Sequence, residues 1–130
     1  MNKKITVFVV DDDPDYLFQT VVHLEKAGYN VISAVSQKEA EDIIDTVKPD
    51  IALFDLMMEQ DDSGFILCYK LKKKYPDLPV IIATSVSRET GLSFGLDSEE
   101  ERRWIKADAY LEKGVRADQL NEEIKRLLKI

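Results

Sequence analysis

The sequence predicts an α/β fold in which five short strands alternate with five helices and form one doubly wound, parallel sheet. Two observations support this prediction. Short apolar runs of strand length recur along the chain, and the stretches between them have the apolar spacing of helices. One run, residues 51–58, is apolar throughout except for Asp55, which is typical of a central strand covered on both faces. Such alternation predicts parallel strands with helices on both sides.

The first strand and helix are expected at the start of the chain. Residues 4–10 (KITVFVV) are β-branched or aromatic apart from the first, which predicts a buried strand. Asp13 suits the N-cap of the following helix, and Pro14 suits its first position. Gly28 predicts that this helix ends near residue 27.

A short helix is expected between the second and third strands. Residues 31–34 predict the second strand. Ser36 and Glu39 have the spacing of a capping box, so we expect a helix over about residues 36–47. The third strand, residues 51–55, is the apolar run that ends at a carboxylate.

The third helix and the fourth strand follow. Asp62 or Ser63 suits the N-cap, and the helix should end before Pro76. Residues 78–83 predict the fourth strand, with Pro79 near its start, where a missing N–H does least harm. The candidates for the buried side of the helix are Phe65, Ile66, Tyr69 and Leu71.

The last third of the chain begins with an irregular segment, residues 84–97, in which two glycines disfavour a helix. Ser98 and Glu101 form a second capping box, which predicts a fourth helix of about two to three turns. Residues 109–111 predict the fifth strand, and residues 117–130 predict the last helix. The apolar stripe of that helix consists of Leu120, Ile124, Leu127 and Leu128.

Right-handed crossovers favour the strand order 2-1-3-4-5, a flavodoxin-like arrangement in which the first and third strands are neighbours. The carboxylates of Asp11, Asp12 and Asp55 should then share one crevice at the ends of these strands. Like charges repel at such distances, and a hard cation such as Mg²⁺ suits an all-oxygen cluster. Thr84 and Lys113 could add a hydroxyl and an ammonium at the same edge. These groups suit phosphoryl transfer to Asp55.

The composition points to one globular domain, residues 1–130, without a membrane span. The chain carries 25 acidic and 18 basic side chains, and its net charge of −7 argues against nucleic-acid binding by this domain. The apolar run at the N-terminus is too short for a signal peptide. The single cysteine, Cys68, fits a reducing cytoplasm and a packing role on a helix face. We therefore expect a cytoplasmic protein.

Taken together, the motifs resemble the receiver domain of two-component response regulators. The resemblance covers residues 5–128 and rests on VVDDDPD after the first strand, PDIALFDLMM through the third, PVIIATS at the fourth and ADAYLEK at the fifth. It implies a phosphoacceptor switch rather than an enzyme, one that assists its own phosphorylation and dephosphorylation. The implied partner is a sensor histidine kinase or a phosphotransfer protein.

The resemblance implies an acceptor and a set of metal ligands. Asp55 would be the phosphorylated aspartate and would also contact Mg²⁺. Asp12 would bind the metal directly, and Asp11 would bind it mainly through water. Met57 would offer the metal its backbone carbonyl, so its side chain has no implied role.

The resemblance also implies a switch. Thr84 would be the switch hydroxyl, and Lys113 would pair with the phosphate. Tyr110 would turn inward when Thr84 moves toward the phosphate. The surface formed by the fourth helix, the fifth strand and the fifth helix would then change, and the same surface could support a homodimer.

Three departures from the family pattern bear on function. Gly114 stands where proline usually follows the lysine; the Lys–Pro bond of the family is typically cis, and a non-proline cis bond costs about 3–4 kcal/mol. The loop at residues 59–64 is longer and more acidic than usual, which could slow an anionic phosphodonor. The segment 85–97 is also long. Its apolar residues could form a lid, a partner contact or local core, and these are Leu92, Phe94 and Leu96.

These departures leave a second function open, a receiver-like interaction module that works without phosphorylation. Enzymes on similar sheets fit less well. The aspartates after the first strand would repel the phosphate of FMN, and the P-loop motif GxxxxGK[ST] is absent. Met57 stands where phosphatases of the haloacid dehalogenase type carry a second aspartate.

Overall fold

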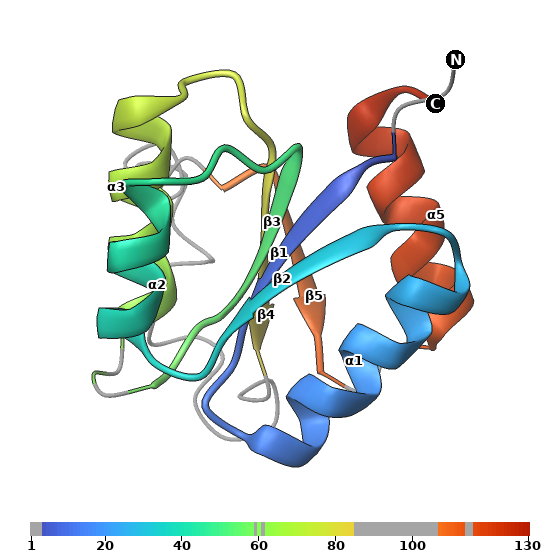
Figure 1. Ribbon diagram of the computed structural model, residues 1–130, viewed down its shortest axis with the longest axis horizontal. Coiled ribbons are helices and arrows are strands. Elements are labelled where there is room, and N and C mark those ends of the chain that lie inside the picture. The colour runs from blue at the N-terminus through green and yellow to red at the C-terminus, as the bar shows by residue number, and fades with distance from the viewer. Residues whose placement is uncertain (1–3, 59, 61, 85–106, 114–115) are drawn as a thin grey trace.

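The computed structural model describes residues 4–58, 60, 62–84, 107–113 and 116–130. Within these residues, five strands form one parallel sheet in the order β2-β1-β3-β4-β5, which confirms the predicted fold class (Figure 1). The strands are β1 (Thr6–Val10), β2 (Asn30–Ala34), β3 (Ile51–Asp55), β4 (Val80–Thr84) and β5 (Ala109–Glu112). The described helices are α1 (Pro14–Lys26), α2 (Gln37–Ile44), α3 (Ser63–Lys74) and α5 (Ala117–Leu128). The helix expected from Ser98 lies outside the described residues.

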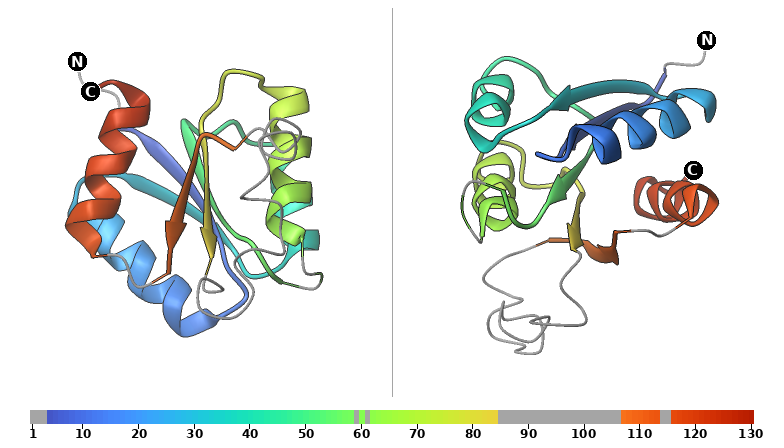
Figure 2. Two further views of the ribbon diagram at one scale, coloured as in Figure 1. Left: turned by 180° about the vertical axis from the view of Figure 1, so that it is seen from behind. Right: turned by 90° about the horizontal axis from the view of Figure 1, so that it is seen from below.

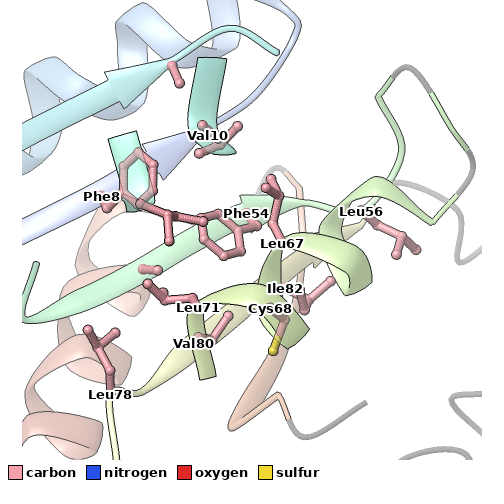
Figure 3. Packing of buried hydrophobic residues seen from close by; sticks show 14 residues of the cluster. Phe8, Val10, Phe54, Leu56, Leu67, Cys68, Leu71, Leu78, Val80 and Ile82 are labelled. Atoms are coloured by element: carbon pink, nitrogen blue, oxygen red, sulfur yellow. The ribbon is translucent and has the colours of Figure 1, made fainter. Parts of the chain in front are cut away.

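The helices cover the two faces of the sheet in pairs, α2 and α3 on one face and α1 and α5 on the other (Figure 1 and Figure 2). Each face has its own buried cluster, because successive side chains of a strand point to opposite faces. On the α2–α3 face, Phe8 and Phe54 meet edge to face with their ring centroids 5.5 Å apart (Figure 3). On the other face, Leu53 belongs to the cluster that contains Ile124 of α5.

Capping residues explain where the first two helices begin. The Asp13 carboxylate accepts hydrogen bonds from two backbone N–H groups in the first turn of α1. Gly28, just beyond the end of that helix, has a φ of +100°, which suits glycine. The Ser36 hydroxyl accepts a bond from the Glu39 N–H, as the capping-box spacing predicts, and the Glu39 carboxylate accepts one from the Val35 N–H.

The buried side of α3 differs from the prediction. Tyr69, a predicted core residue, is 55% exposed. The neighbours before it in the helix, Leu67 and Cys68, are fully buried, and each further residue rotates the side chain about 100° around the axis. Leu71 is buried as predicted, whereas Phe65 and Ile66 are only partly buried.

Four elements are shorter than predicted. Strand β1 begins at Thr6 rather than at residue 4, and helix α5 ends at Leu128 rather than at residue 130. Helix α2 ends at Ile44 rather than near residue 47. The Lys74 ammonium caps this end by donating hydrogen bonds to the carbonyls of Ile44 and Asp45. Strand β4 begins at Val80, after Pro79. None of the helices in the described part of the chain is long and apolar enough to cross a membrane.

Candidate functional site

The carboxyl ends of β1 and β3 carry a cluster of acidic side chains. Asp11 follows β1, and Asp55 is the last residue of β3, which pairs with β1. One carboxylate oxygen from each of Asp11, Asp12 and Asp55 lies within 4.8 Å of the others. Asp11 and Asp55 are 2% and 5% exposed, whereas Asp12 is exposed. The structure thus brings together the three carboxylates for which the strand order predicts a shared crevice.

Backbone hydrogen bonds fix the position of Asp11. Its N–H donates to the carbonyl of Ala34 at 3.2 Å, which continues the pairing of β1 with β2 beyond the last strand residue. Its Oδ1 accepts a bond from the N–H of Asp13 at 2.9 Å, so the carboxylate also braces the turn into α1. Asp11 is therefore held by β2 through its backbone and by the turn into α1 through its carboxylate.

The end of β3 is held by a close approach to the start of α3. The N–H of Leu56 donates to the carbonyl of Ala83 at 2.9 Å, and the N–H of Gly64 donates to the carbonyl of Leu56 at 2.8 Å. A Cβ atom on Gly64 would lie 2.6 Å from the backbone oxygen of Asp55, closer than real Cβ atoms come. Sequence reasoning did not identify this requirement, since a glycine after a polar loop is an ordinary turn signal.

Lys113 extends into the acidic cluster from the residue that follows β5. Its Nζ lies 2.9 Å from Oδ2 of Asp11 and 3.2 Å from Oδ1 of Asp55. Its backbone N–H donates to the carbonyl of Thr84 at 2.8 Å, which prolongs the pairing of β4 with β5. The ammonium also lies 4.9 Å from the ring centroid of Tyr16 in the first turn of α1. One cation therefore contacts both buried acids and an aromatic ring.

The buried charges shift each other's proton affinity. Burial, together with the negative charge of Asp11, raises the pKa of the Asp55 carboxyl to about 7, although the Lys113 ammonium opposes the rise. Burial alone would lower the pKa of Lys113, but its bonds to Asp11 and Asp55 outweigh that effect and raise it. One ammonium is thus not enough to neutralise the cluster, because two buried carboxylates share it.

The donor set suits a hard divalent cation. All three side chains offer carboxylate oxygens, and because one oxygen of each lies within 4.8 Å of the others, a single ion can contact more than one of them. Mg²⁺ prefers oxygen ligands and keeps several of its waters. Because Asp12 is exposed, water can reach this side of the cluster. Met57 lies just beyond β3, and its half-buried side chain packs against the cluster on the α2–α3 face.

Thr84 and Tyr110 lie on the two strands beyond β3. Thr84 is the last residue of β4 and is 7% exposed; it follows Ala83, which is paired with Asp55. Tyr110 of β5 lies opposite Ile82 in the sheet, is half-buried and packs against the cluster on the α2–α3 face. Thr84 is therefore at the same sheet edge as the acids, and Tyr110 is further back along β5.

Some of the sequence predictions fall outside the described residues. They concern the Lys113–Gly114 bond, because Gly114 is not described, and the segment 85–97 with its apolar residues. In the acidic loop after β3, Glu59 and Asp61 are also outside the described part.

Comparisons with protein families and with curated proteins agree with each other. A family model described as the response regulator receiver domain matches residues 7–125. The chain is 31% identical over 129 residues to the alkaline phosphatase synthesis transcriptional regulatory protein PhoP of Bacillus subtilis. The aligned region covers 99% of this chain and 50% of PhoP. The chain spans about half the length of the curated relatives it matches.

Solved structures with the same fold include proteins described as response regulators. A CheY-like response regulator receiver domain protein from Methanospirillum hungatei superposes with a TM-score of 0.83 at 28% identity, over 98% of this chain and 95% of that chain. The response regulator protein TrrA of Thermotoga maritima, solved in complex with Mg²⁺–BeF, superposes with a TM-score of 0.78 at 25% identity. That match covers 95% of this chain and 98% of TrrA.

Proposed function

This chain belongs to the response regulator receiver domain family, and we propose that it is a phosphoaccepting switch in which Asp55 takes a phosphoryl group. The observation that supports this most is the ammonium of Lys113 placed between two buried carboxylates, Asp11 and Asp55, at the edge where the strands end. The Asp55 carboxylate offers a nucleophilic oxygen, and together with the exposed carboxylate of Asp12 it offers a binding site for a cation.

The proposed reaction needs little covalent chemistry from the protein. A carboxylate oxygen of Asp55 attacks the phosphorus of the donor, the new O–P bond forms as the donor's own bond to phosphorus breaks, and the electron pair leaves with the donor. Phosphoryl transfer depends mainly on alignment and charge neutralisation. When bound, Mg²⁺ supplies positive charge beside the phosphoryl oxygens.

Each neighbouring residue has a proposed duty in that transfer. Asp11 and Asp12 hold the metal ion together with Asp55, and the backbone carbonyl of Met57 completes the set from the protein. The Lys113 ammonium pairs with one phosphoryl oxygen, for which a point charge on a flexible stem is well suited. The proposal is supported by their common location, since all of these groups lie at or just beyond the carboxyl ends of strands in one parallel sheet.

The switch itself would run through β4 and β5. In the proposed response, the Thr84 hydroxyl moves toward the phosphoryl group and the Tyr110 ring turns inward, which changes the surface around β5 and α5. The burial of Thr84 at the sheet edge and the half-buried state of Tyr110 support this proposal. The same surface could support a homodimer.

The partners we propose follow from the chemistry of the acceptor. The phosphodonor is a phosphohistidine of a sensor histidine kinase or a phosphotransfer protein, met in the cytoplasm. With a net charge of −7, residues 1–130 act as one receiver unit that does not itself bind nucleic acid.

Incubation with acetyl phosphate and Mg²⁺, followed by mass spectrometry of the intact protein, tests the proposal. We expect the wild type to gain one phosphoryl group and Asp55→Asn to gain none. Asp13→Asn is the matched control, because it changes a nearby aspartate while asparagine still caps α1. If the wild type gains no mass, and beryllofluoride with Mg²⁺ leaves its spectrum unchanged, the alternative of an interaction module that works without phosphorylation takes its place.

A further inference from the structure

The ring of Tyr16 holds a fixed position beside the acidic cluster. Tyr16 lies in the first turn of α1, where its N–H donates to the Asp13 carboxylate at 3.3 Å. Its carbonyl accepts a hydrogen bond from the Thr20 hydroxyl at 2.9 Å, one turn further along the helix. The half-buried side chain therefore starts from a backbone that is tied at both its N–H and its carbonyl.

The face of this ring interacts with the Lys113 ammonium. The Nζ lies 4.9 Å from the ring centroid, inside the range of about 6 Å within which a cation is attracted to an aromatic face. The lysine stem has four flexible carbons between its backbone and the ammonium. Contacts of the ammonium therefore matter more for its position than the local chain does.

The ammonium also contacts two of the three carboxylates that could hold a metal ion. It contacts Oδ2 of Asp11 at 2.9 Å and Oδ1 of Asp55 at 3.2 Å, and both carboxylates belong to the cluster that fits a divalent cation. A metal ion that takes these oxygens weakens the hold of the carboxylates on Lys113. The ring of Tyr16 is not a metal ligand, so its attraction for the ammonium remains.

We propose that Tyr16 is a positioning residue for Lys113. The face of the Tyr16 ring keeps the Lys113 ammonium beside the acidic cluster both before and after the carboxylates bind a metal ion. The proposal rests on the proposed function and adds a residue to that site. It has two consequences of opposite sign. The ring keeps the ammonium close to the bound metal ion, and the repulsion between these two cations weakens metal binding. In the metal-bound protein the ring keeps the ammonium near the incoming phosphoryl group, so it speeds the transfer.

A series of substitutions in the full chain separates these consequences. Tyr16→Leu removes the aromatic face, Tyr16→Phe keeps it, and Tyr16→Trp strengthens it. By titration calorimetry, we expect Tyr16→Leu to bind Mg²⁺ about two- to fivefold more tightly than wild type, Tyr16→Phe to differ little, and Tyr16→Trp to bind it more weakly. The rate of phosphorylation by acetyl phosphate at saturating Mg²⁺ should fall in Tyr16→Leu. General damage to the site would weaken both properties, and such a result would overturn the proposal.

Two further measurements do not depend on phosphorylation. In a Lys113→Met background, Tyr16→Leu should leave the Mg²⁺ affinity unchanged, because the competing ammonium is gone. If Tyr16→Leu raises the Mg²⁺ affinity there as much as it does in the wild type, the proposal is overturned. In the metal-free protein, the ring current of Tyr16 should shift the ε-methylene protons of Lys113 upfield in the NMR spectrum, and Tyr16→Leu should abolish the shift. If the wild type accepts no phosphoryl group, the proposed function fails, while the NMR shift and the Mg²⁺ affinities still decide the role of Tyr16.

Discussion

The ammonium of Lys113 lies 3.2 Å from a carboxylate oxygen of Asp55, although β4 separates the two strands at whose ends these residues lie. An ion pair of this kind normally lowers the pKa of the carboxyl group. Here the pKa of Asp55 is raised to about 7, because burial and the charge of Asp11 outweigh the ammonium. The metal-free site therefore carries more negative charge than it can neutralise, which has consequences for stability and for metal binding.

The raised pKa of Asp55 predicts that the metal-free protein loses stability as the pH rises. The ordinary pKa of an aspartate is about 3.9, so the folded chain holds this proton more tightly than the unfolded chain does. The resulting stabilisation is fully present below the unfolded pKa and is lost as the pH rises through about 7. The free energy of unfolding, measured with urea in the presence of a chelator, should fall between about pH 4 and about pH 8.

Asp55→Asn is the control for this pH dependence. Its amide does not titrate and does not repel Asp11, so the variant should be more stable than wild type near the upper end of the range. Its profile should also be flatter. Parallel profiles for the two proteins would show that the pH dependence comes from other groups.

Mg²⁺ should stabilise the folded protein, since the cluster of carboxylates exists only in the folded chain. At a concentration of about 100 times the dissociation constant, the gain is about 2.7 kcal/mol. The gain should increase as the pH rises through about 7, because the proton on Asp55 competes with the metal. Urea titrations with Mg²⁺ and with chelator at matched ionic strength measure it, and Asp12→Asn, which changes the exposed acid, should show a smaller gain. An equal gain in that variant would place the metal elsewhere.

Lys113→Met should destabilise the metal-free protein by up to about 3 kcal/mol, because it leaves two buried carboxylates without their cation. Adding Mg²⁺ should restore more stability to this variant than to wild type. Arg116→Met is the control, since the Arg116–Asp118 pair is exposed on both sides and contributes little. Equal losses in the two variants, measured by urea unfolding with chelator, would argue against the importance of the buried pair.

The fold could be predicted because its determinants are local. The apolar run of β3 identifies a central strand, and Asp13 and Ser36 mark helix starts through hydrogen bonds within a single turn. The rotation of α3 about its axis could not be predicted in the same way. It depends on the close contact of Gly64 with the end of β3, which turns Leu67 and Cys68 inward and leaves the next residue exposed.

The meeting of the acids follows from the strand order, since the ends of neighbouring parallel strands lie at one edge of the sheet. The contact between Tyr16 and Lys113 has no such signal. It joins the first turn of α1 to the end of β5, and no periodicity or spacing in the sequence connects these two positions. The direction of each side chain decides whether they touch, and only coordinates supply that direction.

The contact of Gly64 with β3 predicts that Gly64→Ala disturbs the site as well as the fold. The added Cβ would lie 2.6 Å from the Asp55 carbonyl oxygen and 2.8 Å from the Cα of Leu56, and backbone atoms cannot move aside as a flexible side chain would. The start of α3 or the peptide of Asp55 must shift, at a cost of about 1–3 kcal/mol. Since Asp55 belongs to the acidic cluster, Mg²⁺ affinity should fall together with stability.

Gly28→Ala separates the steric effect from the general cost of replacing a glycine. Gly28 has a φ of +100° and no neighbour within 4 Å of an added Cβ, so its replacement should cost about 1–2 kcal/mol through backbone strain alone. It lies at the far end of α1 from the acidic cluster, so Mg²⁺ affinity should stay at the wild-type value. Urea unfolding and Mg²⁺ titration of both variants make the comparison. If Gly64→Ala loses stability but binds Mg²⁺ as well as wild type, the close packing of α3 against β3 supports the fold without setting the position of Asp55.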